Sequence, residues 1–167
     1  MAKKALIVTL KLDEQAKAYF NMMRQQHYPK HFNYTDAHLT LFHTLPAGNP
    51  EVIQAIEASA GKKQVCLTVT GLQNTGKGVS FSISSPELIG LHVHMQQCLS
   101  GWVIGKDTQL LKPHITIQNR VTAYRAAKLF ERLQAGFSPF NVTGTGFSTY
   151  FYDKGPWIHA GDFLFEG

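Results

Sequence analysis

The stretch Lys112-Pro113-His114-Ile115-Thr116-Ile117-Gln118 has a counterpart earlier in the chain, His38-Leu39-Thr40-Leu41-Phe42. Both copies read His–apolar–Thr–apolar. Successive side chains of a β-strand point to opposite faces. The His and Thr of each copy therefore share one face, and the aliphatic residues between them can anchor the other face in a core. Two such strands can surround one small anion with two imidazoles and two hydroxyls.

The elements around the two motifs follow a repeated order. Each motif strand is followed by a predicted helix and then by two strands. A small detail also recurs, because residues 69–71 and 142–144 both read Val-Thr-Gly. The pattern predicts a degenerate duplication, with two lobes related by an approximate two-fold axis that brings the motif strands together.

Local signals set the expected boundaries. Four residues read as helix N-caps, two of them followed directly by Pro: Asp13, Asn49, Ser85 and Thr122. The expected strands are residues 4–12, 38–45, 65–69, 79–83, 114–121, 140–152 and 157–165. Hairpins are expected between 65–69 and 79–83, and about Lys154-Gly155-Pro156. Hairpins argue against a doubly wound parallel sheet, so the class is α+β or mixed α/β.

Length and composition favour one globular domain over residues 1–167, with lobes of approximately 1–85 and 86–167 between which the chain can cross. Hydrophobic residues make up 44% and charged residues 16%, which is typical of a chain with a packed core. The net charge of +5 suits an anionic or nucleic-acid ligand. We expect no membrane span, because no apolar run reaches about 18 residues. Cys66 and Cys98 make no disulfide framework, which favours the cytoplasm.

The paired motifs suit proton-transfer chemistry. Two histidines that face one ligand can divide the work of general base and general acid. Thr40 and Thr116 can donate hydrogen bonds to the non-bridging oxygens of a phosphate. One His-x-Thr is a weak signal, since a strand His is often structural. Two copies at equivalent places of a repeat are a much stronger signal.

These residues resemble the paired HxTx motifs of the 2H phosphoesterase superfamily, in particular the bacterial 2′-5′ RNA ligase-like proteins. Lys112 and Pro113 before the second motif strengthen the likeness, and it extends over the whole chain. The resemblance implies a bilobal fold in which antiparallel sheets line a central cleft and helices lie outside. It also implies metal-independent cleavage of 2′,3′-cyclic phosphates or 2′-5′ phosphodiesters. His38, Thr40, His114 and Thr116 would be the catalytic residues, with His114 as base and His38 as acid; ligation as the reverse reaction exchanges these roles.

Four further residues are candidates for substrate binding. Lys112 and Arg120 have the same strand parity as His114, although exposed cations often serve solubility alone. Phe42 shares the predicted cleft face with His38 and Thr40, so its ring is the better candidate for stacking on a base. Tyr150 belongs to an aromatic cluster that can form either a stacking platform or the core of a terminal hairpin.

Other signals are better explained by structure. The stretch Gly71–Gly78 nearly matches a P-loop, but it lacks the final Ser or Thr and precedes a strand, so we expect a hairpin turn. His43 is expected on the face opposite His38, in a packing or capping role. For His159 a structural role is favoured over a place in the cleft. We expect no metal site and no cofactor.

The sequence therefore predicts a cyclic phosphodiesterase or 2′-5′ RNA ligase-like phosphoesterase. Its expected partners are RNA ends or small nucleotide phosphodiesters, with no obligatory protein partner and a monomeric state. The alternative is an RNA- or nucleotide-binding module of the same fold with little catalysis, whose binding would not depend on the two histidines.

Overall fold

The computed structural model describes residues 4–61 and 63–167. Its strands are β1 (Ala5–Leu12), β2 (Leu39–Pro46), β3 (Val65–Asn74), β4 (Val79–Ser84), β5 (His114–Gln118), β6 (Phe140–Tyr152) and β7 (Ile158–Leu164). Its helices are α1 (Glu14–His27), α2 (Pro50–Ser59), α3 (Pro86–Cys98) and α4 (Ala123–Ala135), with short 3-10 turns η1 (Lys30–Phe32) and η2 (Gly105–Thr108). The class is α+β, as expected.

The four helices begin where their capping residues predict. The side chains of Asp13, Asn49, Ser85 and Thr122 each accept a backbone N–H from the first turn of the helix that follows. These bonds satisfy donors that the start of a helix leaves without an intrahelical partner. Helix boundaries in this chain are therefore encoded locally.

All strand pairs of the sheet are antiparallel, in the order β2-β1-β6-β3-β4-β5, with β7 also paired to β6. The long strand β6 joins two groups of strands. Its first part, Phe140–Gly144, pairs with β3, and the remainder pairs with β1 and β7. Each lobe thus has a motif strand at its edge, β2 in the first lobe and β5 in the second. Both predicted hairpins, β3–β4 and β6–β7, are confirmed.

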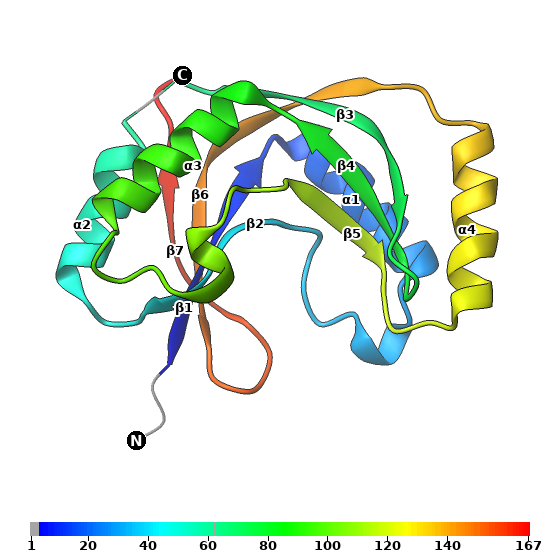
Figure 1. Cartoon of the computed structure of the whole chain (residues 1–167), viewed down its shortest axis with the longest axis horizontal. Helices are drawn as coiled ribbons and strands as arrows, with labels where there is room; N and C mark the ends of the chain where they lie inside the picture. The colour runs from blue at the N-terminus through cyan, green and yellow to red at the C-terminus, as the bar shows by residue number, and fades with distance from the viewer. Residues whose placement is uncertain (1–3, 62) are drawn as a thin grey trace.

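The lobes are not halves of the sequence. Figure 1 shows α2 and α3 at one end of the molecule, beside β1, β2, β6 and β7, and α1 and α4 at the other end, beside β3, β4 and β5. Helix α1 precedes β2 in sequence but packs against β5. A lobe boundary near residue 85 is therefore wrong as a division of the chain, because the chain passes between the lobes several times.

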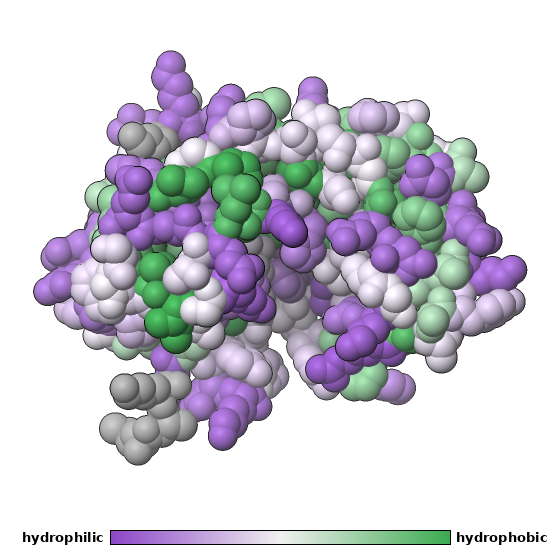
Figure 2. All heavy atoms as spheres, in the orientation of Figure 1, coloured by the Kyte–Doolittle hydropathy of each residue, from purple (hydrophilic) through white to green (hydrophobic). Residues whose placement is uncertain are grey.

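The bend of the sheet brings its two edge strands together, so that β2 and β5 are in contact and lie at the centre of Figure 1. The aliphatic residues of both motifs are fully buried: Leu39 and Leu41 are 0% and 2% exposed, and Ile115 and Ile117 are both 0% exposed. Figure 2 shows the surface hollowed between the two lobes. Among the described helices, none combines the length and apolar character needed to cross a membrane.

Candidate active site

The two motif histidines have the same local geometry. His38 Nδ1 lies 2.8 Å from the carbonyl oxygen of Asp36, and His114 Nδ1 lies 2.8 Å from that of Lys112. A carbonyl oxygen can only accept, so Nδ1 carries the proton in both rings. In the neutral form, Nε2 of each histidine is then the free lone pair. Both rings are thus held by a backbone contact two residues upstream, in the tautomer that leaves Nε2 for chemistry.

His38 lies deep in the cleft beside Trp157, with 4.6 Å between their ring centroids. Burial lowers the pKa of His38 to about 4, with the positive charges of Arg24 and His114 adding to the effect, while the hydrogen bond to Asp36 opposes it. The ring is therefore neutral at pH 7. His114 is exposed on the other wall.

The two threonines differ in their surroundings. Thr40 is partly exposed and pairs directly with Thr9 of β1, which lines the pocket next to the cleft. Thr116 lines the cleft itself, and its Oγ1 lies 3.0 Å from the buried hydroxyl of Ser80. If Ser80 donates to Thr116, the Thr116 proton is free for a ligand oxygen.

A register shift after the Thr of each motif changes which later residues face the cleft. In the β1–β2 register Thr40 pairs with Thr9 and Phe42 with Val8, so Leu41 has no counterpart. In the β4–β5 register Thr116 pairs with Ser80 and Gln118 with Val79, so Ile117 has no counterpart. One extra residue reverses the alternation that follows it. The two shifts fall at equivalent positions, three residues after each His.

This shift contradicts the expected place of Phe42. Its side chain is 0% exposed and stacks on the buried ring of His92, with 4.7 Å between centroids, so it belongs to the core. Gln118 is likewise buried, although the alternation predicted it beside His114. The residues that follow them, His43 and Asn119, line the cleft instead. The expectation that His43 faces away from the cleft is wrong for the same reason.

Asp107 of η2 fixes the end of the first motif strand. Its carboxylate, 2% exposed, accepts the backbone N–H groups of His43 and Thr44 at 2.9 Å and lies 3.0 Å from His43 Nδ1. Burial alone would raise the pKa of Asp107, but the hydrogen bonds from His43 and Thr44 outweigh it and the pKa falls below its ordinary value. No sequence pattern signals this contact, because Asp107 lies in a connecting segment.

Arg24 of α1 fixes the second motif strand. Its side chain is 4% exposed, donates from Nη1 to the carbonyl oxygen of Thr116 at 3.0 Å and from Nε to Asn33 Oδ1 at 2.9 Å, and stacks on Tyr28 at 4.0 Å. Among the described residues it makes no ion pair within 4.0 Å. It lines the cleft beside His38 and was not among the predicted site residues. Its position four residues after Phe20, on the apolar face of the helix, is the signal that could have revealed it.

The charge of the cleft is positive. Its central part, about 850 Å³, is lined by four cationic side chains and by no carboxylate: Arg24, Lys106, Arg120 and Lys154. The adjoining part beside His114, about 740 Å³, adds Lys77 and Lys112, again without a carboxylate. Thr116 and Asn119 line both parts. Such a lining favours an anionic ligand.

Three of the predicted binding residues lie along this cleft. Lys112 lines the part beside His114, and Arg120 lines the centre, where its guanidinium lies 4.6 Å from the ring centre of Phe32. Arg120 has φ +61°, a left-handed conformation that turns the chain after β5. Tyr150 lines a smaller pocket, about 260 Å³, on the other side of His38.

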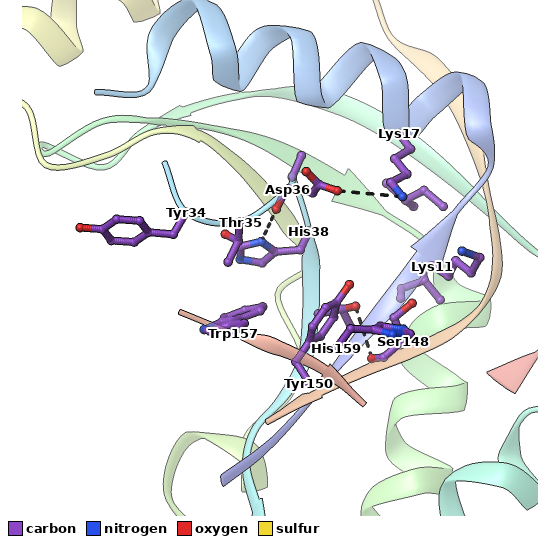
Figure 3. Close-up of a pocket in the computed structure, with 14 residues that line it drawn as sticks. Lys11, Lys17, Tyr34, Thr35, Asp36, His38, Ser148, Tyr150, Trp157 and His159 are labelled. Carbon is purple, nitrogen blue, oxygen red and sulfur yellow. Dashed lines mark hydrogen bonds and ion pairs between the residues drawn. The ribbon is translucent and has the colours of Figure 1, made fainter. Parts of the chain in front are cut away.

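This smaller pocket joins the cleft at His38 and Trp157, which line both. Figure 3 shows the rings of Trp157, Tyr150 and His159 beside it. His159 Nε2 lies 2.8 Å from Asp162 Oδ1, which also accepts the Ser148 hydroxyl at 2.7 Å. His159 thus lines a pocket next to the cleft and is held by an ion pair, so it combines the two roles considered for it.

The remaining sequence signals have structural explanations. Residues 75–78 form the turn of the β3–β4 hairpin, where the Thr75 N–H donates to the Gly78 carbonyl at 3.0 Å. In the part of the chain that the structure describes, no group of three His, Cys, Asp or Glu side chains is placed to hold a metal ion.

A two-lobed α+β fold with paired His-x-Thr strands across a basic cleft defines a protein of the 2H phosphoesterase type. The family model described as the 2′-5′ RNA ligase superfamily matches residues 12–156. The chain belongs to the 2′-5′ RNA ligase superfamily. A search of curated protein sequences found no match.

Solved structures share the fold over their whole length. LigT of E. coli, solved in complex with 3′-AMP, has a TM-score of 0.59 and 16% identity, covering 99% of this chain and 100% of its own. TT0787 of Thermus thermophilus has a TM-score of 0.63 and 16% identity, covering 98% of both chains. A structure titled as a phosphoesterase has a TM-score of 0.61 and 17% identity, covering 99% and 100%. At such identity the likeness concerns the fold alone.

Proposed function

We propose that this protein is a metal-independent phosphoesterase that acts on 2′,3′-cyclic phosphate ends or 2′-5′ phosphodiester linkages of RNA or nucleotides. The observation that carries the proposal is the matched geometry of His38 and His114. Each ring is held through Nδ1 and has Nε2 free, on opposite walls of one basic cleft. In-line displacement at phosphorus needs a proton acceptor on one side and a proton donor on the other.

The two histidines then divide the proton transfers of hydrolysis. One Nε2 takes a proton from water as its oxygen attacks phosphorus, and the other gives a proton to the leaving 2′ or 3′ oxygen. His38 is neutral at pH 7 because its pKa lies at about 4, which suits the accepting role. We therefore propose His38 as base and His114 as acid, the reverse of the roles that the family resemblance implies.

The remaining residues stabilise the phosphate. Thr40 and Thr116 are proposed to donate to its non-bridging oxygens, with Ser80 supporting Thr116. Arg24 adds a fixed positive charge behind Thr116, where charge on the oxygens grows in the transition state. Lys112, Arg120 and Tyr150 line the adjoining spaces and are proposed to contact ribose, base or flanking phosphate groups.

Turnover of 2′,3′-cyclic nucleotides by the wild type and by His38→Ala and His114→Ala tests the proposal. Each variant is expected to lose about 10²–10⁴-fold in kcat, the usual share of one general acid or base. His94→Ala, on the exposed face of α3, is the matched control and should keep full activity. Activity should also survive EDTA. Unchanged turnover in either motif variant would refute the mechanism.

A binding module without catalysis is the second candidate, and the positive cleft is the observation in its favour. It predicts salt-sensitive RNA binding that both histidine variants retain, with no product formed.

A further inference from the structure

A second basic cavity lies outside the cleft, between α1, α4 and the end of β5. It holds about 270 Å³, and we call it the α4 basic pocket. Its lining residues are Gln26, His27, Gln118, Tyr124, Arg125, Lys128, Leu129 and Arg132. The register shift at Ile117 turns Gln118 to this side of β5, away from His114. The pocket therefore lies on the opposite face of the same edge strand.

Three cations of the pocket lie along one side of α4. Arg125, Lys128 and Arg132 are spaced by three and four residues, which places them above one another on a helix, and all three are exposed. No carboxylate lines the pocket. Within the described residues, none of the three makes an ion pair within 4.0 Å. Their charge is therefore available to a ligand.

Two uncharged polar groups line the same pocket. Burial lowers the pKa of His27, and the positive charge of Arg132 lowers it further, so the ring is a neutral hydrogen-bonding group. Gln118 is 5% exposed, and its Oε1 has no hydrogen-bond partner among the described residues. A ligand that offers both anionic acceptors and a hydroxyl donor would satisfy this set. The backbone of RNA offers both, as phosphate and 2′-OH.

The pocket is continuous with the cleft around the edge of the sheet. Gln118 lines the pocket, whereas the next two residues, Asn119 and Arg120, line the cleft. Because β5 is an edge strand, no further strand of the described sheet separates the two sides. Alternate residues of a strand are about 7 Å apart, so the step from Thr116 to Gln118 is close to one nucleotide of an extended chain.

We propose that the α4 basic pocket binds a backbone phosphate of single-stranded RNA whose end occupies the cleft. The inference rests on the proposed function and narrows it, because the substrate class becomes the end of an RNA chain in place of a free cyclic nucleotide. The strand passes from the cleft over residues 119–122 to α4.

The double variant R125Q/R132Q tests this inference, with K4Q/K63Q as control. Both remove two positive charges, and Lys4 and Lys63 are exposed and line neither the cleft nor the pockets next to it. Two substrates are compared, a short RNA that ends in a 2′,3′-cyclic phosphate and the 2′,3′-cyclic mononucleotide. R125Q/R132Q should lower kcat/KM for the RNA and leave it unchanged for the mononucleotide. The control should change neither.

Binding of the same RNA without a cyclic end gives a readout that does not need catalysis. Each lost phosphate contact to a single strand flattens the slope of log affinity against log salt by about 0.7, so R125Q/R132Q should flatten it by about 1.4. Equal losses on both substrates, or an effect no larger than that of K4Q/K63Q, would overturn the inference. If the wild type turns over neither substrate, the proposed function fails, and the salt slopes alone decide whether the pocket binds RNA.

Discussion

The two motif strands share their sequence pattern and their bulge, but they are held in place by opposite charges. Arg24, in the helix before the first motif, donates to the carbonyl oxygen of Thr116 in the second motif strand. Asp107, in the connection before the second motif, accepts the N–H groups of His43 and Thr44 in the first motif strand. The support for each motif strand therefore comes from the segment that precedes the other motif.

The difference lies in what becomes of each charge. Asp107 is surrounded by hydrogen bonds and its negative charge is balanced locally. Arg24 has only neutral partners among its hydrogen bonds and lines the cleft, so its positive charge acts on the ligand space and on His38. Similar supports thus serve different purposes: Asp107 holds a strand, and Arg24 holds a strand and also sets the potential of the site.

The largest expected effect concerns the two histidines. The pH dependence of kcat/KM should be bell-shaped for the wild type, with the acidic limb set by the base and the alkaline limb by the acid. With His38 as base, residual activity of His38→Gln lacks the acidic limb and that of His114→Gln lacks the alkaline limb. The opposite pattern would restore His114 as base, as the family resemblance implies.

Stability should also depend on His38. Its pKa is about 4 in the folded chain, against about 6.5 in the unfolded chain. Between these values the unfolded chain binds more protons, so the free energy of unfolding falls as the pH drops from 6.5 to 4. The loss amounts to about 3 kcal/mol at most for this one group.

Urea unfolding of the wild type and of His38→Gln across this pH range measures the effect. The variant should show a flatter dependence, although His92 and His27, whose pKa values are also lowered by burial, keep part of the slope. Identical slopes would contradict a buried, neutral His38.

Removing the two supports should separate stability from activity. Asp107→Ala leaves two backbone N–H groups without an acceptor, at a cost of about 1–3 kcal/mol each in the free energy of unfolding. Arg24→Gln loses charge-assisted bonds and the positive charge in the cleft, so it should lower kcat more than Asp107→Ala does. Urea unfolding and turnover of a 2′,3′-cyclic nucleotide are measured together.

Two conservative variants separate charge from hydrogen bonding at these supports. Asp107→Asn keeps one acceptor oxygen and should recover part of the stability. Arg24→Lys keeps the charge without the paired donors, and should recover part of kcat. If Arg24→Gln and Asp107→Ala affect kcat equally, Arg24 acts on structure alone.

The smallest effect is expected from the hydroxyl behind Thr116. Ser80→Ala removes a hydrogen bond of about 0.5–1.5 kcal/mol, so kcat should fall by no more than roughly tenfold. Ser84→Ala, exposed on the same strand, is the control. A loss in Ser84→Ala as large as in Ser80→Ala would contradict the role of Ser80.

The sequence by itself determined the features that depend on neighbours in the chain. Caps such as Asp13 and Thr122 set helix starts, alternation around His114 set the buried and open faces as far as Thr116, and Gly-containing turns set the hairpins. These are properties of a few consecutive residues. The repeat of the His-x-Thr pattern was equally legible, and with it the expectation that two strands meet.

Only the tertiary structure decided how each motif strand continues beyond its Thr and which residues support it. The bulges at Leu41 and Ile117 arise from pairing with β1 and β4, and they moved Phe42 into the core and His43 into the cleft. Arg24 and Asp107 reach strands more than sixty positions away. Register and burial depend on partner strands that the chain meets only when folded, so alternation alone predicts them no further than the first bulge.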